Sequence, residues 1–135
     1  MKTVAIVFGL MAISLSVGFF FASSNVSALE FPTYSAEVFE DAQSDGAAII
    51  VDVHASWCST CRAQRRALEA LIEDPRFADI VFLEIDYDTQ KDFMRDLGAS
   101  QRSTLIAFRG PNEIARLVGD TRRGPIEVLL EAVIE

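Results

Sequence analysis

An apolar, β-branched segment that leads directly into two closely spaced cysteines constrains the fold of this chain more than any other feature. Residues 47–55 read Ala-Ala-Ile-Ile-Val-Asp-Val-His-Ala after a glycine, a pattern typical of a strand buried on both faces. Cys58 and Cys61 follow, within a segment that is predicted to be helical as far as about Glu73. We therefore expect both cysteines near the start of a helix, at the end of a central strand.

This placement favours redox chemistry. The first turn of a helix carries unpaired N–H groups and the positive end of the helix dipole, and both stabilise a thiolate at Cys58. Cys61 lies one turn further along the same side, so it is placed to attack a mixed disulfide formed at Cys58 and to release the substrate. Because the thiolate is the attacking species, a lowered pKa makes Cys58 reactive at neutral pH.

Other roles for the two cysteines agree less well with the sequence. A zinc site usually takes four ligands, whereas the whole chain offers 2 Cys and 1 His. A purely structural disulfide between Cys58 and Cys61 closes a very small loop and constrains the unfolded chain little. Two unrelated buried cysteines would leave unexplained why they follow Trp57 at a strand-to-helix junction.

The remaining pattern predicts one α/β domain. A parallel βαβ unit followed by an antiparallel hairpin gives a three-layer sandwich, with a central mixed sheet and helices on both faces. On the cysteine-bearing helix, Leu68 is expected to face inward, whereas Arg62, Arg65 and Arg66 are expected to stay solvated. Outside the first strand and this helix, the predicted elements are a helix at 36–43 capped by Ser35, a strand at 80–86, a helix at 88–97, strands at 104–108 and 114–118, and a helix at 126–134.

The first 28 residues are interpreted as a secretory signal. Met1-Lys2 is followed by a nearly continuous apolar run from Thr3 to Ala22, and Val26-Ser27-Ala28 supplies the small residues needed for cleavage before Leu29. The alternative is an uncleaved membrane anchor, since an apolar run of about 20 residues is long enough to span a bilayer. Both interpretations export the predicted domain, residues 29–135. We expect the periplasm, with secretion or inner-membrane anchoring as alternatives.

The charge of the chain bears on its partners. The 12 basic and 20 acidic residues give a formal net charge of −8, and there is no Lys- or Arg-rich block. Nucleic acid is therefore not an expected partner. Ordinary solubility explains the acidity.

Residues 51–61, Val-Asp-Val-His-Ala-Ser-Trp-Cys-Ser-Thr-Cys, resemble the active-site segment of the thioredoxin family, in which an aspartate precedes Trp-Cys-x-x-Cys. The likeness of pattern covers most of residues 31–135. It implies a thioredoxin-like fold and a thiol–disulfide oxidoreductase, in which Cys58 is the nucleophile and Cys61 the resolving cysteine. Trp57 then matches the surface tryptophan beside the nucleophile.

Asp52 matches the family's buried aspartate, which exchanges a proton with the resolving thiol. Its place in an apolar strand agrees with this role, because burial raises the pKa of a carboxyl group toward neutrality. The alternative is a structural carboxylate whose hydrogen bonds are satisfied at the end of the strand.

Three residues depart from the family pattern. Ser103 occupies the place of a cis-proline, so the Arg102–Ser103 bond is either trans with a reshaped groove or cis at a cost of about 3–4 kcal/mol. Arg102 stabilises the thiolate and makes the protein more oxidising if it projects toward Cys58; otherwise it is a solvated loop residue. His54 shares a strand face with Asp52 and either tunes the cysteines or packs as a framework residue.

The expected function is disulfide exchange with exported protein thiols. An extended substrate segment is expected to pair with the backbone near Ser103 and Thr104, beside Ser59 and Thr60. The Ser59-Thr60 dipeptide does not distinguish a reductase, an oxidase or an isomerase. No metal or diffusible cofactor is expected beyond the Cys58–Cys61 disulfide. A reductant would need a membrane electron-transfer partner.

Two other functions remain open from the sequence. One is a non-catalytic module that holds a metal or an iron–sulfur cluster with the same cysteines, as a dimer, because in related folds the missing proline keeps metal away from the pair. The other is a scaffold used only for binding, which the presence of both cysteines disfavours. Membrane contact is expected only if the N-terminal segment is retained.

Overall fold

The computed structural model describes residues 31–135, which form a four-stranded sheet covered by helices. The helices are α1 (Ala36–Ser44), α2 (Ser59–Ile72), α3 (Lys91–Asp96) and α4 (Arg123–Ile134), with a short 3-10 helix, η1, at Pro75–Phe77. The strands are β1 (Ala48–His54), β2 (Val81–Asp86), β3 (Thr104–Arg109) and β4 (Asn112–Val118).

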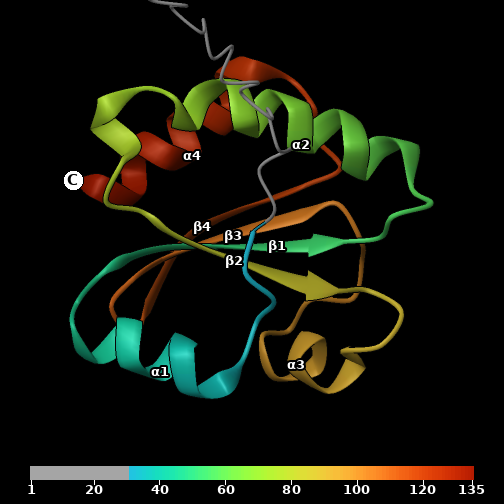
Figure 1. The fold of residues 1–135 in the computed structure, drawn as a ribbon, viewed down its shortest axis with the longest axis horizontal. Coiled ribbons are helices and arrows are strands. Elements are labelled where there is room, and N and C mark those ends of the chain that lie inside the picture. The colour runs from blue at the N-terminus through green and yellow to red at the C-terminus, as the bar shows by residue number, and fades with distance from the viewer. Residues whose placement is uncertain (1–30) are drawn as a thin grey trace, which may run out of the picture.

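The sheet is mixed, with strand order β2-β1-β3-β4. β1 runs parallel to β2 and antiparallel to β3, and β3 and β4 form the C-terminal antiparallel hairpin. Helices α2 and α4 cover one face of the sheet, and α1 and α3 cover the other (Figure 1). This arrangement confirms the predicted three-layer sandwich.

Strand β1 lies at the centre of both cores. Every residue from Ala48 to Val53 is buried. Because successive side chains of a strand point to opposite faces, Ile50 packs in the cluster beneath α2 and α4, whereas Ile49 and Val51 pack in the cluster with α1 and α3. Asp52 shares the face of Ile50, so its carboxyl group points toward the layer that contains α2.

Several element boundaries follow from single side-chain caps. The Oγ of Ser35 accepts a hydrogen bond from the N–H of Val38 at 3.2 Å and begins α1 as predicted. The predicted helix at 88–97 is shorter than expected. Asp86 Oδ1 accepts hydrogen bonds from the N–H groups of the next turn and delays the start of α3 to Lys91.

The 3-10 helix η1 was not predicted. Asp74 and Pro75 end α2 as expected, but Asp74 also caps a new turn, because its Oδ1 accepts a hydrogen bond from the N–H of Arg76 at 2.9 Å. Phe77 follows in this turn and is 1% exposed. The turn therefore places an aromatic ring in the core cluster beneath α2 and α4.

Within residues 31–135, no helix is long and apolar enough to cross a membrane. The predicted secretory signal, residues 1–28, and its cleavage site lie outside the described residues. The division of the chain into a signal and a domain therefore stays a prediction.

Candidate active site

A tight turn joins β1 to α2 and ends in Cys58. The N–H of Cys58 donates to the carbonyl oxygen of Ala55 at 3.0 Å, and Cys58 is the N-cap of α2. Its extended backbone lets the sulfur accept a hydrogen bond from the N–H of Cys61 at 3.2 Å. The predicted place of Cys58 at a helix N-terminus is confirmed, and its sulfur takes the position that a Ser or Asp oxygen usually has.

The two sulfurs lie in a nearly closed environment. Cys58 is 4% exposed and Cys61 1% exposed, and both are free thiols. The hydroxyl oxygen of Ser103 lies 3.5 Å from the Sγ of Cys58 and 3.0 Å from the Sγ of Cys61. The Ser103 hydroxyl is therefore within hydrogen-bond distance of both sulfurs.

The same surroundings separate the pKa values of the two thiols. Burial raises the pKa of Cys58, but hydrogen bonds from the Cys61 thiol, the Ser103 hydroxyl, the Cys61 N–H and Arg102 outweigh it and lower the pKa to about 6. Burial raises the pKa of Cys61, and the neighbouring Cys58 raises it further. At neutral pH, Cys58 is thus the thiolate and Cys61 the thiol.

Ser103 reaches the sulfurs through an unusual backbone. The described chain has no cis peptide bond, so the Arg102–Ser103 bond is trans, and Ser103 is its one non-glycine residue with a positive φ, +56°. A left-handed conformation of this kind costs a non-glycine residue about 1–3 kcal/mol. Its surroundings hold it there: Ser103 N–H donates to the Val53 carbonyl, and Gly119 N–H donates to the Ser103 carbonyl, both at 2.8 Å.

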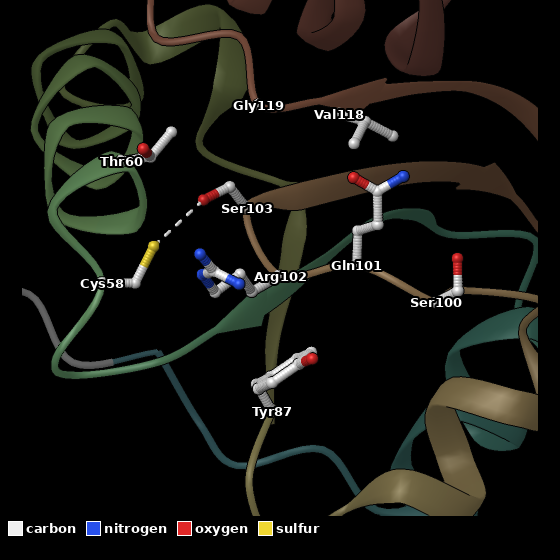
Figure 2. A pocket seen from close by; sticks show the side chains of 9 residues that line it. All are labelled: Cys58, Thr60, Tyr87, Ser100, Gln101, Arg102, Ser103, Val118 and Gly119. Carbon is white, nitrogen blue, oxygen red and sulfur yellow. Dashed lines mark hydrogen bonds between the residues drawn. The ribbon is translucent and has the colours of Figure 1, made fainter.

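Arg102 projects toward Cys58 (Figure 2). Of the two arrangements expected from the sequence, a residue beside the thiolate or a solvated loop residue, the structure has the first. Its guanidinium lies over the indole ring of Trp57, 4.9 Å from the ring centre. A hydrogen bond to Cys58 raises the pKa of Arg102. Trp57 is 55% exposed, and its Nε1–H donates to Asp88 Oδ2 at 2.7 Å, so the indole forms a fixed surface for the guanidinium.

Asp52 is 2% exposed and is paired with a residue of α2. Its Oδ2 accepts hydrogen bonds from Nε of Arg65 at 3.1 Å and from a terminal guanidinium nitrogen of Arg65 at 2.7 Å. Arg65 also donates to Glu84 on β2 and lies over the ring of Phe31. Burial raises the pKa of Asp52, and Arg65 opposes this rise.

The prediction that Arg65 is solvated is wrong, because its side chain is 12% exposed. Arg65 follows Cys61 by four residues and Cys58 by seven, and this spacing places it on the helix face that carries both cysteines. An aspartate in an apolar strand stays charged only if a cation reaches it, so Asp52 itself was a signal in the sequence that a nearby arginine could be buried. Gln64, also missed, is 1% exposed and donates to the carbonyl of Asp120 at 2.9 Å.

His54 lies on the face of Asp52, as predicted. Its Nδ1 is 3.8 Å from Asp52 Oδ2 and has no hydrogen-bond partner among the described residues. One group of side chains in the described part of the chain resembles a metal site. It consists of Asp52, His54 and Glu84, each of which has one potential ligand atom within 4.8 Å of the other two. Neither cysteine belongs to this group, and Arg65 already supplies a positive charge to both carboxylates.

A groove with a volume of about 230 Å³ opens beside Cys58 (Figure 2). Among its lining residues, Arg102 and Ser103 lie nearest to the sulfur, with Tyr87 and Val118 on opposite sides of them. Arg102 is the one positively charged residue that lines it in the described part of the chain. The full lining is Cys58, Thr60, Tyr87, Ser100, Gln101, Arg102, Ser103, Val118 and Gly119.

Two residues predicted to bind substrate do not line this groove. Thr104 is 1% exposed, its hydroxyl donates to the Gln101 carbonyl at 2.8 Å, and its backbone lies between β1 and β4. Ser59 is the exposed first residue of α2 and lies outside the lining. The N–H and the carbonyl of Ser103 are both hydrogen-bonded within the protein and cannot pair with a substrate. The preceding residue, Arg102, makes no backbone hydrogen bond to another described backbone group, so its backbone is available to an extended substrate.

A mixed α/β sandwich with a cysteine pair at the start of α2 defines a thiol–disulfide oxidoreductase of thioredoxin-like fold. Comparison with known proteins gives the family. The family model described as Thioredoxin matches residues 30–132, and the chain belongs to the thioredoxin family.

Individual relatives agree with this assignment. Thioredoxin-2 of Saccharomyces cerevisiae is 30% identical over 86 residues, which are 63% of this chain and 81% of that protein. Thioredoxin H2 of Arabidopsis thaliana is 27% identical over 81 residues, and the match spans 59% of its length. Among solved structures, Trxlp from Edwardsiella tarda EIB202 superposes with a TM-score of 0.72 at 36% identity, over 75% of this chain and 98% of that chain. A Malassezia sympodialis thioredoxin, 18% identical with a TM-score of 0.68, shares the fold.

Replacing Arg102 with alanine is expected to raise the pKa of Cys58 above about 6, because a hydrogen bond to the thiolate is lost. At about pH 6, alkylation of Cys58 by iodoacetamide should slow by about two- to fivefold as the thiolate fraction falls. The pH profile of alkylation measures this. Arg95→Ala, at a 70% exposed arginine of α3, is the control. An unchanged profile in Arg102→Ala would show that the guanidinium does not stabilise the thiolate.

Replacing Arg65 with alanine is expected to lower the free energy of unfolding by about 1–3 kcal/mol, since the buried carboxylate of Asp52 loses its hydrogen bonds. Without Arg65, the pKa of Asp52 rises further, so the folded protein binds a proton that the unfolded chain binds less strongly. Stability then falls as the pH rises, and the loss should be larger at about pH 8 than at about pH 5.

Urea unfolding at the two pH values measures both effects of Arg65→Ala. The exposed neighbour offers a matched control, because Arg66→Ala should change the free energy of unfolding by less than about 0.5 kcal/mol. Equal losses in the two variants, or a loss independent of pH, would contradict the pairing of Arg65 with Asp52.

Proposed function

We propose that this chain exchanges disulfides with protein thiols through Cys58 and Cys61. The observation that carries this is the environment of Cys58: an N-cap position, three hydrogen-bonding neighbours and a pKa lowered to about 6, at the wall of an open groove. Cys58 attacks a substrate disulfide, a mixed disulfide forms, and Cys61 attacks Cys58 to release the substrate. The redox-active disulfide replaces a diffusible cofactor.

The groove supports a protein or peptide substrate. Arg102 lines the groove, and its backbone, which makes no hydrogen bond to another described backbone group, can pair with an extended segment; the exposed Trp57 precedes the nucleophile. Thr60 and Gln101 add polar side chains along the same groove. The thioredoxins among the relatives also favour protein thiols and disulfides as partners over the metal-binding alternative.

The low pKa of Cys58 favours the reduced form of the pair. A stabilised thiolate makes a disulfide easier to reduce, and thioredoxin itself has a reduction potential of about −270 mV. We therefore place this protein on the more oxidising side of thioredoxin. Among the residues that line the groove, Arg102 is the one whose positive charge stabilises the Cys58 thiolate and so raises the reduction potential.

We also propose that the protein acts outside the cytoplasm, in the periplasm. The support is the apolar N-terminal run and the Val26-Ser27-Ala28 cleavage pattern. Exported substrates and, for a reductant, a membrane electron donor follow from that location.

Insulin reduction with dithiothreitol is the test of the exchange activity. The unaltered chain should accelerate precipitation of the insulin B chain, and Cys58→Ser should abolish the acceleration, since the nucleophile is lost. Cys61→Ser should instead accumulate a mixed disulfide at Cys58, visible by mass spectrometry without reductant. A glutathione buffer gives the potential in the same preparation, expected above about −270 mV. No acceleration by the unaltered chain would refute the proposed activity.

The location has its own test. Full-length chain expressed in a Gram-negative host should be recovered from the periplasm with Leu29 as its first residue, by N-terminal sequencing of the purified product. Replacing Ala28 with a bulky residue should block cleavage and leave the protein attached to the membrane. Cytoplasmic recovery with the N-terminal segment intact would contradict export.

A further inference from the structure

Ser103 contacts both reacting sulfurs from a position closed to solvent. It is 2% exposed, and its Oγ lies 3.0 Å from the sulfur of Cys61 and 3.5 Å from that of Cys58. Figure 2 shows the contact with Cys58. A hydroxyl group can accept one hydrogen bond and donate another at the same time. Ser103 can therefore accept the proton of the Cys61 thiol while donating its own proton on the other side.

Asp52, to which the family resemblance assigns proton exchange, makes no hydrogen bond to either cysteine in the described part of the chain, and its buried Oδ1 has no hydrogen-bond partner there. Its Oδ2 accepts both hydrogen bonds from Arg65, and the side chains that act on its charge are Arg65, His54 and Glu84. The side chains with the largest effect on the Cys61 thiol are Cys58 and Ser103, and the Ser103 hydroxyl lies 3.0 Å from its sulfur. The contact with the thiol that must lose its proton thus belongs to Ser103.

The backbone holds this hydroxyl in place. The N–H of Ser103 is bonded to the Val53 carbonyl and its carbonyl to the N–H of Gly119, so the residue is tied to β1 on one side and to the end of β4 on the other. A proline here would have no N–H for Val53 and no hydroxyl for the sulfurs. The trans bond and the positive φ of Ser103 therefore supply two contacts that the family's usual residue cannot make.

We propose that Ser103 is a catalytic residue that relays the proton of Cys61 to the departing substrate sulfur, an inference that rests on the proposed function. In the mixed disulfide, Cys58 is bonded to the substrate sulfur and Cys61 is a thiol. The Cys61 proton moves to Ser103 Oγ as the Ser103 hydroxyl proton moves to the substrate sulfur. The Cys61 sulfur bonds to Cys58, the Cys58–substrate bond breaks, and its electron pair stays with the substrate.

The products balance the reaction. One protein thiol and one mixed disulfide become the Cys58–Cys61 disulfide and a free substrate thiol, and the Ser103 hydroxyl is regenerated. The two cysteines are oxidised by two electrons in total, and the substrate disulfide is reduced. No charged intermediate is left in the closed space around Cys61, which is 1% exposed.

Rapid mixing of the reduced full chain with glutathione disulfide tests the relay. Acid quenching followed by mass spectrometry counts the Cys58–glutathione mixed disulfide over time. In Ser103→Ala, resolution should slow by at least about tenfold, so the mixed disulfide accumulates, whereas it stays low in the unaltered chain. The resolution rate of the variant should also rise steeply with pH, because Cys61 must then lose its proton to solvent.

A second variant separates the hydroxyl from the backbone. Ser103→Gly also lacks the hydroxyl, but glycine adopts a φ of +56° without strain. Both variants should show the same slow, pH-dependent resolution. Ser44→Ala, at the exposed end of α1, is the control and should resolve as the unaltered chain does.

The outcomes distinguish the relay from the exchange activity. Resolution at the unaltered rate in Ser103→Gly overturns the relay, and so does slow resolution in Asp52→Asn with normal resolution in Ser103→Ala. If the unaltered chain forms no mixed disulfide at Cys58, the proposed exchange itself fails, whatever the Ser103 variants do.

Discussion

The ion pair between Asp52 and Arg65 is the interaction on which the geometry of the site depends. An aspartate in the central strand cannot remain charged among apolar neighbours unless a cation reaches it, because an unpaired buried charge costs several kcal/mol. Arg65 reaches it from α2 and extends to Glu84 on the neighbouring strand, so one guanidinium ties the cysteine-bearing helix to two strands. Arg65 lies on the helix face that carries Cys58 and Cys61, so this contact helps to hold that face toward the sheet.

The second constraint is the closed arrangement of polar hydrogens around the sulfurs. Two thiols, one hydroxyl and one backbone N–H share a space that water hardly enters, with Arg102 at its open side. A negative charge in such a space is stabilised only by groups already in place. The charge therefore settles on Cys58, which has the most donors, and Cys61 keeps its proton until the mixed disulfide has formed.

The sequence predicted those features that depend on local pattern. The apolar run of β1, the Ser35 cap and the cysteines at the start of α2 each follow from a few adjacent residues, and the structure confirms them. The solvation of Arg65 was predicted wrongly, because helical periodicity assigns a charged residue to water and does not include the strand beneath the helix. The turn of η1 was missed for a related reason, since it depends on a single aspartate cap.

The conformation of Ser103 could not be predicted from the sequence. The departure from proline was visible, and both a cis and a trans bond were compatible with it. The choice depends on Val53 and Gly119, which are far from Ser103 in sequence and meet it only when the sheet forms. The same contacts explain why Thr104, next in the chain, is enclosed between strands and does not line the groove.

The contact between Arg102 and Cys58 makes the charge of the groove depend on oxidation state. In the reduced protein, the thiolate and the guanidinium cancel, and the groove is close to neutral. Once Cys58 enters a disulfide, its charge disappears and Arg102 is left as an uncompensated cation on a protein whose formal net charge is −8. A partner with an acidic surface therefore meets a different groove in the two states, and electrostatics alone lets it distinguish the oxidised protein from the reduced one.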